Sequence, residues 1–175
     1  MGKLKTIIKH LWQGEADTAR AVPEALLKRL AQRVAASEQR HSGEIRICVE
    51  ASLPWSYLSQ LGRDCTMRQL TRQRAVTMFG KLRVWDTEHN NGVLIYLLLA
   101  EHAIEIVADR GITRRVPQAT WDTLVAGMRE DFRSGRFERG LMQAVDAVDG
   151  ILSRHFPLAA GDANPNELAD APDLR

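Results

Sequence analysis

Residues 85–111, WDTEHNNGVLIYLLLAEHAIEIVADRG, hold two apolar segments on either side of a short polar turn. The first segment covers residues 93–100, the turn lies at residues 101–102, and the second segment covers residues 103–108. Two apolar segments joined by so short a turn are typical of a β-hairpin. The first segment has no polar alternation, which predicts a strand that is covered on both faces.

Patterns outside the hairpin predict one more strand and four helices. Residues 44–50 (EIRICVE) alternate in the way typical of a strand that is covered mainly on one side. Apolar side chains at helical spacing follow Thr66, which has a capping-box partner in Gln69. The four helices are expected over residues 22–38, from Thr66 onward, after Pro117 and over residues 137–156.

The resulting order is helix, strand, helix, strand, strand, helix, helix. Two strands that are linked through a helix within one sheet are parallel with a right-handed crossover, whereas the hairpin strands are antiparallel. Helices that flank such a sheet bury both of its faces. The sequence therefore predicts an α/β/α sandwich: a small mixed β-sheet, made of a parallel crossover and an antiparallel hairpin, with helices on both faces.

Composition indicates one domain with an arm and a tail. A chain of 175 residues, 45% hydrophobic and 26% charged, is long enough to bury its own core. Residues 22–157 are expected to form the α/β domain. Residues 1–21 are expected to be a partly ordered N-terminal arm, either a frayed terminus or a basic amphipathic segment that contacts a membrane surface or a partner. Residues 158–175 hold four acidic residues and one arginine without periodicity, and are expected to be disordered.

The sequence also disfavours several classes of protein. No segment approaches the roughly 20 apolar residues of a transmembrane helix, and the N-terminal residues lack a signal-peptide core. The net charge of +2 is too small and dispersed to indicate nucleic-acid binding. Cys48 and Cys65 have no disulfide or zinc spacing, and Cys48 is expected to be buried in a strand. A soluble cytoplasmic protein without an organic cofactor is expected.

Polar residues at one end of the hairpin form the candidate site. Parallel strands start at the same end of a sheet, where the antiparallel third strand ends. That end gathers carboxylates and amides, the oxygen ligands that Ca²⁺ and Mg²⁺ prefer. The expected metal ligands are Asp86, Asp109, Glu44 and Asn91. The structural alternative is turn chemistry, in which Asp86 caps a turn and Asp109 pairs with a nearby arginine.

Three neighbouring residues are candidates for binding a phosphate or a carboxylate. A guanidinium holds either anion through two hydrogen bonds, which suggests Arg110. Histidine side chains exchange protons near neutral pH, so His89 is a candidate acid or base. Asn90 completes the expected ligand-binding set. The alternatives are a solvated run of arginines and an ordinary exposed loop histidine.

Four motifs, in this order, resemble the TPM domain family. They are SGEI at residues 42–45, NGVLI at residues 91–95, IVADRGI at residues 106–112 and MxxxFxxGxFxxGL at residues 128–141. The resemblance implies an α/β/α sandwich, a divalent-metal site at the sheet end and, for some members, phosphatase activity. Many members have a signal peptide and a C-terminal hydrophobic segment, and longer members have a GYGLE-type sequence where this chain has DRGI. A compact, cytosolic bacterial member is therefore expected.

Two functions from different classes fit these residues. The first is a non-catalytic interaction or accessory module, in which a cation stiffens the sheet end and the partner is a protein or a membrane-associated complex. The alternative is a metal-assisted phosphate-ester hydrolase in which Arg110 neutralises the phosphate. The sequence has no activated nucleophile and no ligand set of histidines, which favours the module. No catalytic residue is assigned.

Overall fold

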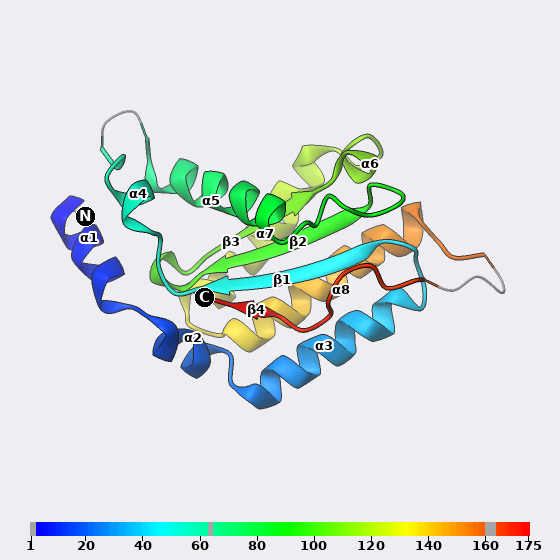
Figure 1. Ribbon diagram of the computed structural model, residues 1–175, viewed down its shortest axis with the longest axis horizontal. Helices are drawn as coiled ribbons and strands as arrows, with labels where there is room; N and C mark the ends of the chain where they lie inside the picture. The colour runs from blue at the N-terminus through cyan, green and yellow to red at the C-terminus, as the bar shows by residue number, and fades with distance from the viewer. Residues whose placement is uncertain (1–2, 63–64, 160–163) are drawn as a thin grey trace.

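The computed structural model describes residues 3–62, 65–159 and 164–175, and its centre is a mixed β-sheet (Figure 1). The strand order is β3-β2-β1-β4. β1 and β2 are parallel, β2 and β3 are antiparallel, and β4 is parallel to β1. The strands are β1 (Glu44–Glu50), β2 (Gly92–Leu98), β3 (Ala103–Ala108) and β4 (Asp173–Leu174). The parallel crossover and the antiparallel hairpin are confirmed.

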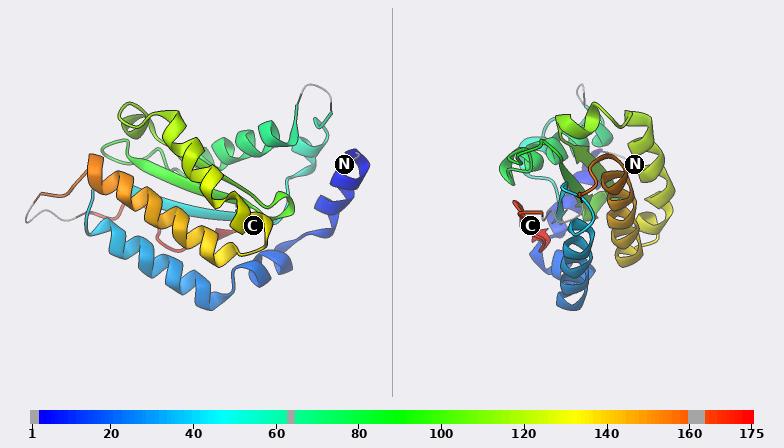
Figure 2. Two further views of the ribbon diagram at one scale, coloured as in Figure 1. Left: turned by 180° about the vertical axis from the view of Figure 1, so that it is seen from behind. Right: turned by 90° about the vertical axis from the view of Figure 1, so that its right-hand side faces the viewer.

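Helices pack on both faces of the sheet, which confirms the α/β/α sandwich (Figure 2). On one face lie α3, α7 and α8, and on the other lie α4 and α5. The longer helices are α3 (Glu24–Glu38), α5 (Met67–Lys81), α7 (Gln118–Arg133) and α8 (Phe137–His155). The shorter elements are α1 (Lys3–Trp12), α2 (Glu15–Ala21), α4 (Trp55–Leu58), the 3₁₀ turn η1 (Leu99–Glu101) and α6 (Arg110–Thr113).

The continuous apolar run of β2 is explained by two cores. Side chains at Val93, Ile95 and Leu97 join the core under α3, α7 and α8. The alternate side chains join the core under α5, because successive residues of a strand point to opposite faces. A strand in the middle of a sandwich therefore has no polar face.

Two local expectations hold in detail. The Thr66–Gln69 capping box forms at the start of α5: the backbone N–H of Gln69 donates to Thr66 Oγ1 at 3.3 Å, and that of Thr66 donates to Gln69 Oε1 at 2.8 Å. Cys48 is buried in β1, and burial raises the pKa of its thiol to about 12 because the thiolate loses hydration. Cys48 therefore acts as a small core residue.

The N-terminal arm consists of two helices, α1 and α2, that the sequence patterns do not predict. A buried histidine, His10, accepts a hydrogen bond from the backbone N–H of Leu53 at 3.1 Å and so fixes α1 to the body. None of the helices within the described ranges has the length and hydropathy needed to cross a bilayer.

The C-terminal segment differs from the disordered tail that its composition predicts. Residues 160–163 lie outside the described residues, but residues 164–175 run along β1 and end in β4. Arg175 donates its backbone N–H to the Val49 carbonyl at 2.9 Å, and its own carbonyl accepts from Ala51 at 2.8 Å. Leu168 and Leu174 pack against the two cores. Disorder is therefore wrong for residues 164–175, because the free backbone groups of β1 and two leucines hold a segment with no periodic pattern of its own. The domain limits at residues 21–22 and 157–158 stay predictions.

Candidate functional site

The structure brings part of the predicted polar cluster together. The Gly111 backbone N–H donates to the Asn90 carbonyl at 2.9 Å, and a Cβ at Gly111 would collide with the carbonyl oxygens of His89 and Asn90. The absence of a side chain at residue 111 thus allows the two loops to touch. Arg110 Nε then donates to Asn90 Oδ1 at 2.7 Å. His89 is exposed.

The three carboxylates of the predicted metal site each have a separate partner. Asp86 is exposed and pairs with Arg83. Asp109 caps α6, where its Oδ1 accepts from the Arg110 backbone N–H at 2.6 Å. Glu44 Oε2 accepts from the Leu168 backbone N–H at 3.2 Å, beneath the C-terminal segment.

The central strand β2 separates Glu44 from Asp109. Glu44 pairs with Gly92 on one side, and the Asp109 backbone N–H donates to the Gly92 carbonyl on the other. Two strand spacings amount to roughly 10 Å between their backbones. A Cβ at Gly92 would collide with the Val84 carbonyl oxygen, so the chain itself fills the space above this glycine.

Three buried oxygens at this end of the sheet nevertheless have no hydrogen-bond partner among the described residues. They are Glu44 Oε1, Asn91 Oδ1 and Asp109 Oδ2. Such oxygens suit a hard cation, and burial raises the pKa of Glu44 because its charged form loses hydration. Across residues 3–62, 65–159 and 164–175, however, no three His, Cys, Asp or Glu side chains are grouped closely enough to hold a metal ion. The cation site stays a prediction.

A second candidate site is a groove of about 460 Å³ along the free edge of β3. One wall is α5 and the other is α7, because these helices pack on opposite faces of the sheet next to its edge strand (Figure 2). The floor is formed by η1 and β3, including Ile104 and Ile106. This volume is within the usual range of ligand-binding clefts.

The backbone of β3 presents unpaired groups to this groove. The Asp109 N–H points to β2, and in an antiparallel pair the direction alternates along the strand, so the backbone groups of Ile104 and Ile106 point away from β2. The Ile106 carbonyl accepts from Arg72 at 2.6 Å. Within the part of the chain that the structure describes, the Ile104 N–H, the Ile104 carbonyl and the Ile106 N–H have no partner.

The groove is lined by four arginines and by three carboxylates, those of Glu101, Glu105 and Asp122, so its lining carries one net positive charge. Arg68 lies on the α5 wall, and Arg129 and Arg133 lie on the α7 wall; among the described residues none of them has an ion-pair partner within 4.0 Å. Arg72 is paired with Glu105 at 3.3 Å. Trp121 lines the same groove and is only 2% exposed, and its indole N–H has no acceptor in the part of the chain that the structure describes. These groups suit an anionic ligand with hydrogen-bond acceptors.

This groove is absent from the site predicted from the sequence, although two signals mark it. Arginines four residues apart occur on both walls, Arg68 with Arg72 and Arg129 with Arg133, which places each pair on one helix face. Glu105 lies between two isoleucines in β3, and a charge at alternate positions is typical of an edge strand. Combining the signals requires knowing that α5 and α7 flank the same strand.

Comparison with known proteins agrees with the fold. The NMR structure of the BA42 protein from the psychrophilic bacterium Bizionia argentinensis superposes with a TM-score of 0.69 at 24% sequence identity, over 90% of this chain and 94% of that one. The solution structure of the N-terminal domain of a P. gingivalis protein gives a TM-score of 0.56 at 21% identity, over 81% and 87% of the two chains. No curated protein sequence matches this chain. The family model of the TPM domain matches residues 16–151. The chain therefore belongs to the TPM domain family, as the four motifs at residues 42–141 predict.

Proposed function

We propose that this TPM domain is a non-catalytic interaction module that binds an extended, acidic peptide segment of a partner protein as an added strand beside β3. The observation that carries the proposal is the open β3 edge, whose unpaired backbone groups line a groove between two arginine-bearing helices. Strand addition uses main-chain hydrogen bonds for affinity and side-chain pockets for specificity.

Each part of the groove has a role in this proposal. The N–H and carbonyl of Ile104 and the N–H of Ile106 pair with the peptide backbone. Arg72 leaves the Ile106 carbonyl when the peptide N–H takes its place. Arg68, Arg129 and Arg133 pair with carboxylates of the peptide, and the indole N–H of Trp121 donates to a peptide acceptor. Arg72 protects the empty edge in the way that charged side chains protect edge strands in other sheets.

A peptide titration tests the proposal. The probe is the capped hexapeptide acetyl-Glu-Val-Glu-Val-Glu-Val-amide, added to ¹⁵N-labelled protein. Saturable amide shifts are expected at Ile104 and Ile106, and the double variant Arg129→Glu/Arg133→Glu should weaken binding by about tenfold or more, since each charge-assisted contact contributes about 1.5–3 kcal/mol. Arg154→Glu, an exposed arginine of α8, is the matched control and should bind as the unaltered chain does.

Two results would contradict strand addition. One is equal binding of the corresponding lysine-valine hexapeptide, since the positive walls should repel it. The other is a set of shifts that is confined to residues away from β3. Circular dichroism of the charge-reversed variant establishes that it is folded.

A divalent-cation site at the sheet end is a second part of this proposal, and a metal-assisted phosphate-ester hydrolase is the alternative to it. The cation would bind among the unpartnered oxygens at this end of the sheet, those of Asn91 and Asp109, with Glu44 across β2 on the other side, and a bound ion would stiffen the sheet end. Titration with Ca²⁺ or Mg²⁺ should then shift the amides of residues 86–92 and 109–112. Arg110, held by Asn90, would bind a phosphate in the hydrolase alternative, which predicts turnover of a phosphate ester that is lost in Asp109→Asn.

A further inference from the structure

Helix α1 lies on the body of the protein by its polar side and turns its apolar side to solvent. Its buried residues are Thr6, 9% exposed, and His10, 2% exposed. Four of its five large apolar side chains, Leu4, Ile8, Leu11 and Trp12, are 72%, 46%, 67% and 84% exposed, and the fifth, Ile7, is half-buried. Their spacing places all four on one helical stripe, on the side away from Thr6 and His10. A helix in a soluble protein ordinarily has the reverse orientation.

Polar contacts fix this orientation. His10 Nδ1 accepts from the Leu53 backbone N–H at 3.1 Å, so the ring proton lies on Nε2, which is 3.2 Å from Glu101 Oε1. Lys9 Nζ is 3.6 Å from the same carboxylate oxygen. Because these contacts occupy the inner side of α1, the apolar stripe stays available for another surface.

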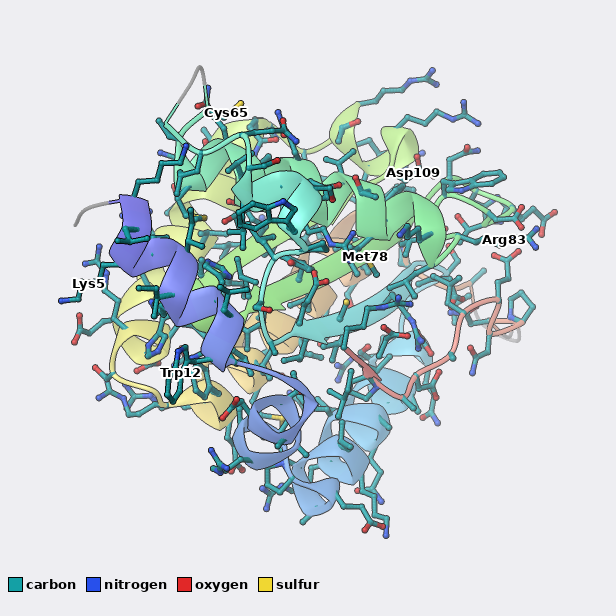
Figure 3. The ribbon with its side chains drawn as sticks, turned by 60° about the vertical axis from the view of Figure 1, so that its left-hand side comes forward. Lys5, Trp12, Cys65, Met78, Arg83 and Asp109 are labelled. Atoms are coloured by element: carbon teal, nitrogen blue, oxygen red, sulfur yellow. The ribbon has the colours of Figure 1, made fainter. Side chains whose placement is uncertain are left out.

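The charge of α1 has one sign. The helix sequence KLKTIIKHLW contains Lys3, Lys5 and Lys9 and no acidic residue. Figure 3, which turns this end of the molecule toward the viewer, shows Lys5 and Trp12 on α1. The short helix α4, with Trp55 62% exposed, lies at the same end of the molecule (Figure 1). An apolar stripe flanked by lysines and ended by a tryptophan is typical of a helix that lies in a bilayer interface.

We infer that α1 attaches this protein to the surface of an anionic lipid membrane, with Leu4, Ile8, Leu11 and Trp12 inserted among the acyl chains and with Lys3 and Lys5 among the headgroups. An anionic membrane is favoured as the surface that binds α1 because its charge is opposite to that of the lysines. A second copy of the chain would bring like charges on α1 together, whereas an anionic surface attracts each of them. The helix is too short to span the bilayer, so attachment is peripheral and reversible.

Vesicle flotation tests the inference on the chain of residues 1–175. The probes are vesicles of phosphatidylcholine alone and vesicles with roughly 30% phosphatidylserine, the anionic lipid of the bilayer surface. The protein should float with the anionic vesicles, and added salt should weaken this binding. Leu11→Gln/Trp12→Gln should lower partitioning by about tenfold or more, since two large apolar side chains no longer insert. Lys3→Gln/Lys5→Gln should lower it on anionic vesicles by about fivefold for each lysine.

The control is Trp85→Gln, which removes a tryptophan that is 49% exposed and lies beyond α5, away from α1. It should float as the unaltered chain does. Equal partitioning of the Leu11→Gln/Trp12→Gln variant, or no preference for anionic vesicles, would overturn the inference. So would a concentration-dependent dimer in light scattering that Trp12→Gln abolishes, because the stripe would then belong to a second copy.

Discussion

The two sides of the sheet differ in what covers the outer backbone groups of their last long strand. On the β1 side, the C-terminal segment closes the ladder with β4. On the β3 side, α5 and α7 flank the strand and leave a groove of about 460 Å³. Edge strands are normally shielded because they template pairing with other chains. This difference between an open and a closed edge is the observation on which the proposed strand addition rests.

Helix α5 forms an ion pair with β1 and another with β3, and the two pairs differ in how far they are buried. Arg74 of α5 binds Glu50 of β1 in the interior, where the two side chains are 8% and 6% exposed. Arg72 of α5 binds Glu105 of β3, where the side chains are 38% and 19% exposed. Arg74 therefore contributes to the stability of the fold, whereas Arg72 covers backbone groups of an accessible edge strand.

The largest expected effect comes from breaking the interior pair. Arg74 donates to Glu50 through Nη2 at 2.6 Å and Nε at 2.9 Å, and the Tyr96 hydroxyl donates to the same carboxylate at 2.6 Å. Arg74→Ala leaves Glu50 buried without its counter-charge, so urea denaturation should give a loss of about 3–5 kcal/mol in the free energy of unfolding. The double variant Arg74→Met/Glu50→Gln should recover part of the lost stability, because no buried charge is then left unpaired. A loss below about 1 kcal/mol for Arg74→Ala would contradict the assignment of this pair to fold stability.

The sequence predicts those parts of the fold that depend on interactions between residues close together in the chain. β1 follows from alternating side chains, β2 and β3 follow from two apolar segments joined by a short turn, and the start of α5 follows from the capping pair at residues 66 and 69. All of these signals are local. β4 has two residues and no period, and it exists only because β1 offers a ladder. For α1 the sequence leaves two interpretations open, a frayed terminus and a basic amphipathic segment, because the side that faces the body is set by contacts with residues distant in the chain.

In the candidate site, too, contacts between neighbouring loops are predicted from the sequence, and contacts across the sheet are not. The hairpin fixes the loops on either side of it, so Asn90 and Arg110 meet as the sequence suggests. Glu44 and Asp109 lie on strands with β2 between them, and convergence at one end of a sheet does not bring such side chains into contact. The groove depends on where two helices lie relative to one edge, which a pattern within one segment does not report.

The stability of the closed side of the sheet should depend on pH, because buried acidic side chains lie beneath the C-terminal segment. Burial, followed by the charges of Glu44 and Asp170, raises the pKa of Glu38 to about 8. The folded chain thus keeps a proton on Glu38 that the unfolded chain releases near pH 4.5. The stability from this group is fully present below pH 4.5 and is lost as the pH rises through about 8.

Urea denaturation between pH 5 and 8.5 measures this loss. The unaltered chain should lose about 4 kcal/mol more over this range than Glu38→Gln does. Burial lowers the pKa of His41, which gives a slope of opposite sign in both proteins and cancels in the difference. Glu24→Gln, an exposed carboxylate of the same helix, should keep the slope of the unaltered chain. Parallel curves for Glu38→Gln and the unaltered chain would refute the raised pKa.

The smallest expected effect concerns Arg72 at the open edge. Arg72→Ala should lower the free energy of unfolding by about 0.5–1 kcal/mol, because its ion pair with Glu105 is partly solvated. The same change frees the Ile106 carbonyl, so a neutral hexapeptide of alternating serine and valine should bind a few-fold more tightly than it binds the unaltered chain. A neutral probe separates this gain from the loss of positive charge. A destabilisation as large as that of Arg74→Ala, with no change in peptide binding, would make Arg72 a structural residue and remove the difference between the two arginines. Weak destabilisation with tighter binding would instead support the proposal that Arg72 of α5 covers the Ile106 carbonyl only until a peptide strand binds there.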